Sequence, residues 1–420
     1  MAVRPHEAAA LGWSFAYFFF LLAGYYVLRP LRDEMGIAGG VRNLQWLFTA
    51  TFVVMLVAVP VFGALVARLP RKRFVPLVYH FFVLNIALFW VLLTLGYEKV
   101  NVARVFFVWI SVFNLFAVSV FWSFMADLWG SERGSNAGKR LFGFIAAGGS
   151  AGALLGPGLA VLLAVPIGPV NLLILAAVLL ELAVLCARRL EAVAPQSGKK
   201  TQPADAGALG GGWLAGIGMV LRSPYLAGIA LWVTLLSLAG TFLYFQQANI
   251  VAAASDDPAV RTRIFATIDL AIGVLTIIVQ FFATGRLIKY LGVGGAAAAL
   301  PLVFVLGFAV LAFTPMLAAV IAFQAIQRAT NFALSNPARE ILFTVVGREE
   351  KYKAKNVIDI VVFRGADAAS GWLFSALRTA HFELSTISLA TVPVAGLWFV
   401  LALGLGRGQE KRAGSLNPAP

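Results

Sequence analysis

Two arginines near the end of the first long apolar segment have the spacing of an anion site. The run is Leu28-Arg29-Pro30-Leu31-Arg32-Asp33-Glu34, and residues three apart lie on one face of a helix. A guanidinium donates two parallel hydrogen bonds to phosphate or carboxylate, so Arg29 and Arg32 together suit such an anion. In the alternative interpretation the arginines lie at a helix end, where they snorkel or pair with the following acids. The residues alone leave both interpretations open.

A second group of charges lies in an apolar segment near residue 360. Lys355 and Asp359 are four residues apart, and Arg364 and Asp367 are three apart. At these spacings each pair can form along one helix. The pairs are either structural or a gate that a charged substrate opens.

Isolated polar residues in other apolar segments are further candidates. Asp269 and Arg328 each interrupt an apolar run, and charges inside membrane spans mark sites by default because they are costly to bury. We predict that Arg29, Arg32, Arg328, Lys355 and Arg364 bind substrate, and that Gln246 and Asn249 line the cavity. Asp269, Asp359 and Asp367 are candidates for proton coupling or gating.

The composition indicates that these residues lie in a membrane protein. Of 420 residues, 60% are apolar or aromatic and 12% are charged, and the mean hydropathy is +0.87. An average soluble domain is about 25% charged. The low charge and high hydropathy of this chain therefore exclude a disordered chain, a secreted disulfide scaffold and an ordinary cytosolic enzyme. The single cysteine, Cys186, excludes an internal disulfide and a cysteine-based metal site. The histidines show no ligand spacing and no Walker loop is present, so we expect no metal, no cofactor and no enzyme activity.

Twelve segments are long and apolar enough to be membrane helices, which need about 20 residues. They are residues 11–31, 44–67, 75–95, 102–126, 141–164, 168–187, 225–248, 261–283, 294–313, 315–334, 357–380 and 384–406. A polar, glycine-rich stretch at 188–222 is predicted to be a flexible linker between six-helix halves at 1–187 and 223–420.

The positive charges predict how the chain is oriented. With the N-terminus in the cytoplasm, about 23 Lys and Arg residues fall in cytoplasmic loops and about 8 on the other side. We therefore expect a multi-pass protein of a bacterial inner membrane with both termini cytoplasmic. The net charge of +14 follows from these separate loops, so no nucleic-acid partner is expected.

Repeated motifs indicate the fold. The loop Gly63–Arg73 begins with a stretch, Gly63–Pro70, that matches Gly285–Gly292 after the corresponding span at an offset of about 222 residues. The first of these loops resembles the loop signature of major facilitator transporters, whose two parallel six-span halves are joined by a cytoplasmic linker. Gly148, Gly152 and Gly156 are spaced by four residues, which permits close helix contact; their spacing also resembles a facilitator antiporter motif. We predict twelve transmembrane helices in two pseudo-repeated six-helix bundles.

Three blocks resemble the bacterial and plastid ATP/ADP translocases. They are the segment Tyr25–Asp33, the run Asn336-Pro337-Ala338-Arg339-Glu340, and the run Lys351-x-Lys353-x-Lys355-x-x-Ile358-Asp359. The resemblance implies a twelve-span exchanger of nucleotides or related phosphorylated solutes, with Arg32 and Lys355 contacting phosphates. Arg32 replaces the lysine usual in that family, and Pro30 departs from its pattern.

The predicted function is secondary transport of a small anionic solute, by alternating access in a monomer within the lipid bilayer. The most specific form is exchange of a nucleotide or another phosphorylated metabolite. The alternative is a proton-coupled carrier of an unrelated organic or lipid-like solute.

Overall fold

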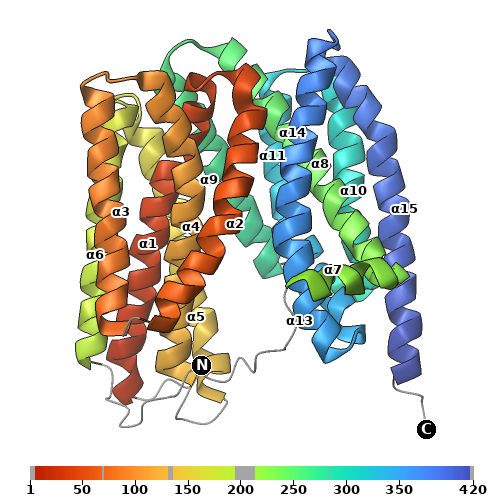
Figure 1. Cartoon of the computed structure of the whole chain (residues 1–420), viewed down its shortest axis with the longest axis horizontal. Coiled ribbons are helices and arrows are strands. Elements are labelled where there is room, and N and C mark those ends of the chain that lie inside the picture. The colour runs from red at the N-terminus through yellow and green to blue at the C-terminus, as the bar shows by residue number, and fades with distance from the viewer. Residues whose placement is uncertain (1–4, 69–70, 131–135, 194–212, 283, 417–420) are drawn as a thin grey trace. The chain divides into compact units, whose positions relative to one another are not determined.

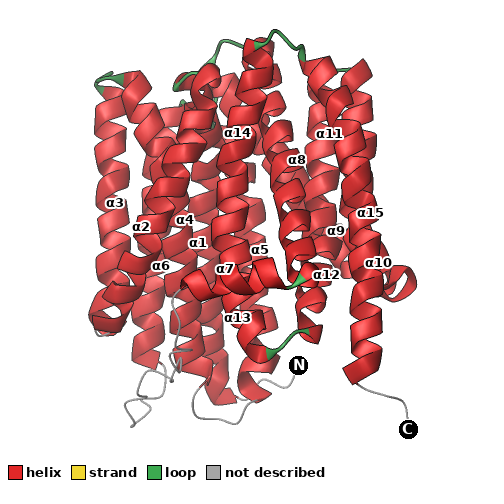
Figure 2. Ribbon diagram, turned by 45° about the vertical axis from the view of Figure 1, so that its right-hand side comes forward, coloured by secondary structure: helices red, strands yellow, loops and turns green. Residues whose placement is uncertain are grey.

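The computed structural model describes residues 5–68, 71–130, 136–193, 213–282 and 284–416, and these residues form helices joined by short loops, without strands (Figures 1 and 2). Apolar segments become helices in lipid because a helix satisfies every backbone N–H and C=O internally. Ten helical segments in the described residues are long and apolar enough to cross a membrane. The chain is thus a multi-pass, all-α membrane protein.

The helices of the first half overlap the predicted spans, and their ends differ from the predicted ends by about seven residues or fewer. They are α1 (Pro5–Ala38), α2 (Leu44–Arg68), α3 (Arg71–Thr94), α4 (Lys99–Gly130), α5 (Asn136–Leu163) and α6 (Leu172–Val193), with short 3₁₀ turns η1 (Val41–Asn43) and η2 (Pro169–Asn171).

The helices of the second half are more often interrupted. They are α7 (Trp213–Arg222), α8 (Pro224–Ala254), α9 (Pro258–Phe282), α10 (Thr284–Phe313), α11 (Leu317–Thr330), η3 (Asn331–Ser335), α12 (Asn336–Leu342), η4 (Phe343–Val345), α13 (Arg348–Asn356), η5 (Val357–Val362), α14 (Phe363–Thr379) and α15 (Leu384–Leu416). Gly292, at φ 67°, breaks α10 close to the predicted start of its span at residue 294.

The predicted spans at 315–334 and 357–380 contain π-helical turns and are not among the ten candidate membrane helices. η3 joins α11 to α12, and η5 joins α13 to α14, with right-handed helical backbone at each junction. Such π turns inside helices are frequent at functional sites. Both turns lie next to predicted site residues.

Parts of two predicted features lie outside the described residues. These parts are residues 194–212 of the linker and Leu69-Pro70 of the Gly63–Arg73 loop. The ends of the predicted linker are helical: α6 continues to Val193, and α7 begins at Trp213. α7 packs closely on the next half, since a Cβ on Gly216 would lie 2.7 Å from the carbonyl oxygen of Lys353.

Contacts divide the chain into two units. Unit 1 comprises Met1–Val41, Val53–Ala206 and Ser255–Leu270; unit 2 comprises Arg42–Phe52, Gly207–Ala254 and Ala271–Pro420. These units differ from a simple division at the linker, because the start of α9 groups with unit 1 and the start of α2 with unit 2.

Glycines set the close packing of α1 against α5 in unit 1. A Cβ on Gly148 would lie 2.5 Å from the carbonyl oxygen of Phe15, and one on Gly156 would lie 2.6 Å from that of Ala23. A Cβ on Gly152 would fall on the backbone of Phe19. The predicted close helix contact is therefore present, and it positions α1.

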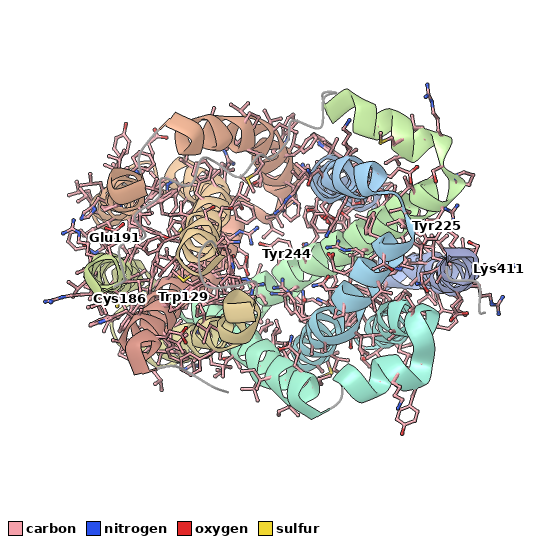
Figure 3. All side chains as sticks on the ribbon, turned by 90° about the horizontal axis from the view of Figure 1, so that it is seen from below. Trp129, Cys186, Glu191, Tyr225, Tyr244 and Lys411 are labelled. Carbon is pink, nitrogen blue, oxygen red and sulfur yellow. The ribbon has the colours of Figure 1, made fainter. Side chains whose placement is uncertain are left out.

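In unit 2, α8 packs on α14, α11 and α15. Tyr225 and Tyr244 mark the beginning and the later part of α8 in Figure 3. The hydroxyl of Tyr225 donates to the carbonyl of Leu342 at the end of α12 (2.9 Å). At the start of α2, Thr49 accepts a hydrogen bond from the Trp372 indole of α14 (3.0 Å).

The same helix pairs occur in both halves of the sequence. The pairs of α1 with α4, α5 and α6 correspond to those of α8 with α11, α14 and α15. Likewise α3 packs on α4 and α6 as α10 packs on α11 and α15. This correspondence is the pseudo-repeat that the motifs predict.

Candidate substrate-binding site

The α1 arginines lie in unit 1 and have different partners. Arg29 forms an ion pair with Asp269 of α9 (3.0 Å), and the two side chains are 10% and 5% exposed. Arg32 lies 3.5 Å from Asp33 and stacks its guanidinium over the Phe107 ring of α4, 4.3 Å from the centroid. Both arginines thus have acidic partners inside the protein. Arg32 pairs with a following acid, as the alternative interpretation expected, whereas Arg29 pairs with a distant helix.

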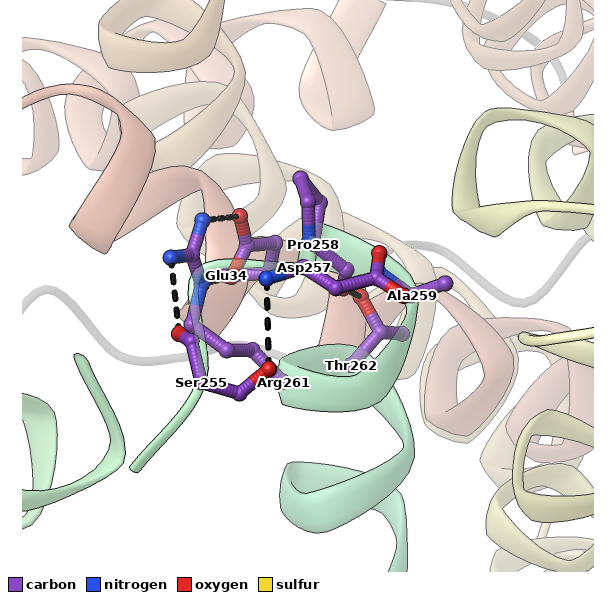
Figure 4. A network of polar contacts seen from close by, with 7 residues as sticks. All are labelled: Glu34, Ser255, Asp257, Pro258, Ala259, Arg261 and Thr262. Atoms are coloured by element: carbon purple, nitrogen blue, oxygen red, sulfur yellow. Dashed lines mark hydrogen bonds and ion pairs between the residues drawn. The ribbon is translucent and has the colours of Figure 1, made fainter. Parts of the chain in front are cut away.

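A second ion pair links α1 with the start of α9 and was not predicted. Arg261 donates two hydrogen bonds to the Glu34 carboxylate (2.7 and 2.8 Å) and one to the carbonyl of Ser255 (Figure 4). Asp257 caps α9 by accepting a hydrogen bond from the Ala259 N–H (2.9 Å). Glu34 and Arg261 are 227 residues apart, so no local sequence pattern predicts this pair.

In unit 2 a chain of buried amides connects α8 with α11. Gln327 donates to the side-chain oxygen of Gln324 (2.8 Å), and Gln324 donates to that of Gln247. All three side chains are buried. None of these three glutamines was predicted from the sequence as a site residue.

The two amides predicted to line a cavity have protein partners. Gln246 is fully buried, and its oxygen accepts a hydrogen bond from Ser388 of α15 (2.9 Å). Its Nε2 has no hydrogen-bond partner among the described residues. Asn249 donates back to the carbonyl of Phe245 on its own helix (2.7 Å).

Arg328 is the exception among the predicted substrate cations. It follows the amide chain directly, on α11, and is half-buried. Within the described ranges no hydrogen bond or ion pair holds its guanidinium. The helical run from Leu317 to Leu342 puts it about 17 Å from one end and about 21 Å from the other, at 1.5 Å per residue. Arg328 therefore lies near the middle of this helical run.

The charges of the segment from 355 to 367 pair in two ways. Arg364 lies 3.5 Å from Asp367, as its spacing predicted. The other predicted pair is wrong: Lys355 bonds both oxygens of Glu340 (2.7 and 2.6 Å), and Asp359 lies 3.4 Å from Arg339. The reason is that α12 presents its own ion-pairing residues to this segment.

Asp367 is held by hydroxyl groups as well as by Arg364. Ser237 and Thr241 of α8 donate to its Oδ1 at 2.5 and 3.3 Å. In the described part of the chain, no three His, Cys, Asp or Glu side chains are placed to hold a metal ion.

Comparisons with known proteins identify the fold. No protein-family model and no curated sequence matches the chain. Among solved structures, the nucleoside transporter NupG superposes with a TM-score of 0.66 at 11% identity, covering 96% of this chain and 99% of that one. A bacterial homolog of the human lysosomal transporter Spinster has a TM-score of 0.58 at 14% identity, covering 98% and 99%. A POT family transporter in complex with 5-aminolevulinic acid has a TM-score of 0.61 at 13% identity, covering 96% of both chains. The chain therefore has the all-α, pseudo-repeated fold of major facilitator transporters.

Proposed function

We propose that this protein is a secondary transporter of a small anionic solute that works by alternating access. Two pseudo-repeated bundles with polar sites at mid-membrane depth suit this mechanism. The solved structures with the same fold include, by their names, a nucleoside transporter and a POT family transporter, which supports transport rather than catalysis.

The guanidinium of Arg328, with which no described residue pairs, carries the proposal of an anionic solute. A charge at mid-membrane depth is costly unless it meets an opposite charge or water. Arg29, Arg32, Lys355 and Arg364 each have an acidic partner in the protein. Arg328 has none in the described residues, so an anion from solution is the partner that would offset its cost.

The proposed solute class is a nucleotide or another phosphorylated metabolite, moved by exchange. The three blocks that resemble ATP/ADP translocases support this choice. Two of these blocks are joined through the Glu340–Lys355 and Arg339–Asp359 pairs. For Lys355 to contact a phosphate as the resemblance implies, the solute must take the place of Glu340.

The same proposal includes the arrangement in the membrane. We place both termini and the 188–222 linker in the cytoplasm of a bacterial cell, between halves at 1–187 and 223–420. The protein is proposed to act as a monomer.

A screen of ligand-induced thermal shifts tests the solute class. Detergent-purified protein is heated with ATP, ADP, sugar phosphates, and the neutral counterparts adenosine and glucose. Phosphorylated compounds should raise the melting temperature, and Arg328→Gln should abolish the shift. Equal shifts with adenosine and ATP, unchanged in Arg328→Gln, would overturn the proposal.

The proton-coupled alternative has one observation in its favour. The Oδ2 atom of Asp269 has no hydrogen-bond partner among the described residues, although the side chain is 5% exposed. Asp367 is less suited because hydroxyl donors hold its carboxylate. Acidification of the liposome lumen on adding solute, lost in Asp269→Asn, would support this alternative.

A further inference from the structure

The position of Asp269 makes it an internal anion for Arg29. Asp269 lies about 17 Å from the start of α9 and about 20 Å from its end, at 1.5 Å per residue. A short carboxylate at this depth cannot reach the membrane surface. Only one of its oxygens is engaged: Oδ1 contacts Arg29, and Oδ2 has no hydrogen-bond partner within the described ranges.

Arg29 is itself built as an anion-binding group. It is buried beside the Tyr26 ring, 5.7 Å from the centroid, and it lies one turn before Arg32 on α1. Asp269 meets Arg29 through a single carboxylate oxygen at 3.0 Å, whereas an arginine has five N–H donors. A phosphate offers more oxygens than Asp269 uses.

We propose that Asp269 competes with the transported anion for Arg29, so that solute binding displaces the carboxylate and breaks the ion pair between α1 and the middle of α9. This inference rests on the proposed anion transport. It assigns to Asp269 a role as positioning residue, since it acts on the solute through Arg29.

Displacement of Asp269 breaks one of the two ion pairs that join α1 and α9 among the described residues. Residues up to Leu270 group with unit 1, and those from Ala271 group with unit 2. Within unit 1, the Arg29–Asp269 and Glu34–Arg261 pairs have opposite polarity along α1 and α9. Loss of the first pair leaves the second as the remaining ion pair between α1 and α9 in the described residues.

Binding of labelled ATP to the purified full chain tests the competition. Asp269→Asn removes the competitor and should tighten ATP binding about tenfold, while slowing ATP/ADP exchange because bound solute leaves more slowly. Glu34→Gln is the matched control, since it removes a carboxylate from the other α1–α9 pair with the same change in charge. It should leave the dissociation constant of ATP unchanged. Equal tightening in both variants, or weaker binding in Asp269→Asn, would overturn the proposal.

A measurement on the unmodified protein covers the case in which Asp269→Asn does not fold. A hydrophobic carbodiimide modifies carboxyl groups within the membrane, and mass spectrometry of the peptide gives the fraction of Asp269 modified. ATP should raise this fraction several-fold, and adenosine should not. An unchanged or lower fraction with ATP would contradict displacement. If the wild-type protein binds and exchanges no phosphorylated anion at all, the proposed function fails; if it binds ATP without these effects, only the role of Asp269 fails.

Discussion

At the scale of single residues, the cations proposed to meet the solute fall into two groups. Some already have an acidic partner in the protein, and Arg328 has none among the described residues. Arg328 has no acidic partner in the described residues, whereas Lys355 is bonded to both oxygens of Glu340. This difference predicts opposite effects when the charges are changed.

Arg328→Gln should weaken the binding of phosphorylated anions by about 10- to 100-fold, because a hydrogen bond to a charged group contributes about 1.5–3 kcal/mol. The folded state should be retained, since no internal ion pair is lost. The dissociation constant and the melting temperature of the variant measure the two effects. Arg189→Gln, at an exposed position on α6, serves as the control and should change neither. A normal dissociation constant in Arg328→Gln would remove Arg328 from the site.

Glu340→Gln should have the reverse effect if Lys355 meets a phosphate. The pair is partly exposed, and such pairs contribute only about 0–1 kcal/mol, so the gain in affinity should be about threefold. In the double variant Glu340→Gln/Lys355→Gln the gain should disappear. Titration of each variant with labelled ATP gives these values, and a gain that survives in the double variant would show that Lys355 does not contact the solute.

At the scale of helices, α1 is positioned by glycines on one side and by ion pairs on another. Substitutions at these two kinds of contact should destabilise the protein for different reasons. A glycine at a helix contact protects against overpacking, whereas a buried ion pair costs most when one partner is left alone.

Gly152→Ala should lower the melting temperature, because its Cβ would fall on the backbone of Phe19. Overpacking of this kind costs about 1–3 kcal/mol. Gly158→Ala on the same helix meets nothing within 4 Å and should leave stability unchanged or raise it slightly through helix propensity. Equal melting temperatures of the two variants would contradict the close α1–α5 contact.

Glu34→Arg alone should destabilise the protein by about 3–5 kcal/mol, because it leaves Arg261 without its buried partner. The double variant Glu34→Arg/Arg261→Glu restores an ion pair with reversed polarity. It should recover a large part of the lost melting temperature. No recovery, measured by thermal unfolding in the same detergent, would show that the pair does not link α1 to α9 in solution.

At the scale of the whole molecule, most of the fold could be predicted from the sequence. Apolar runs separated by polar residues predict membrane helices directly, and the helix bounds agree with the predicted spans to within a few residues at most ends. The π turns could not be predicted in this way, because they lie inside apolar runs. One π turn begins just after Arg328, and the other contains Asp359.

The candidate site was less predictable from the sequence than the fold. Spacing along one helix identified the Arg364–Asp367 pair, but it gave the wrong partner for Lys355. The pairs Arg29–Asp269 and Glu34–Arg261 join residues more than 200 positions apart. Such contacts depend on how helices pack, and a hydropathy pattern does not contain that information.

The proposed orientation can be tested with single cysteines in a Cys186→Ser background. Ser197→Cys in the linker should react with a membrane-impermeant maleimide only after the inner side of the membrane becomes accessible. Glu98→Cys, between α3 and α4, should react from the outside in intact cells. Labelling of both positions from the same side would contradict the arrangement of the spans.

Exchange in proteoliposomes is the most direct test of the central claim, that this fold moves a phosphorylated anion by using Arg328. Vesicles loaded with ADP receive labelled ATP outside, beside empty vesicles and vesicles carrying Arg328→Gln. We predict uptake that requires internal ADP and falls at least tenfold in the variant. Absence of uptake for ATP and every other phosphorylated solute tested, or uptake unaffected by Arg328→Gln, would contradict the account.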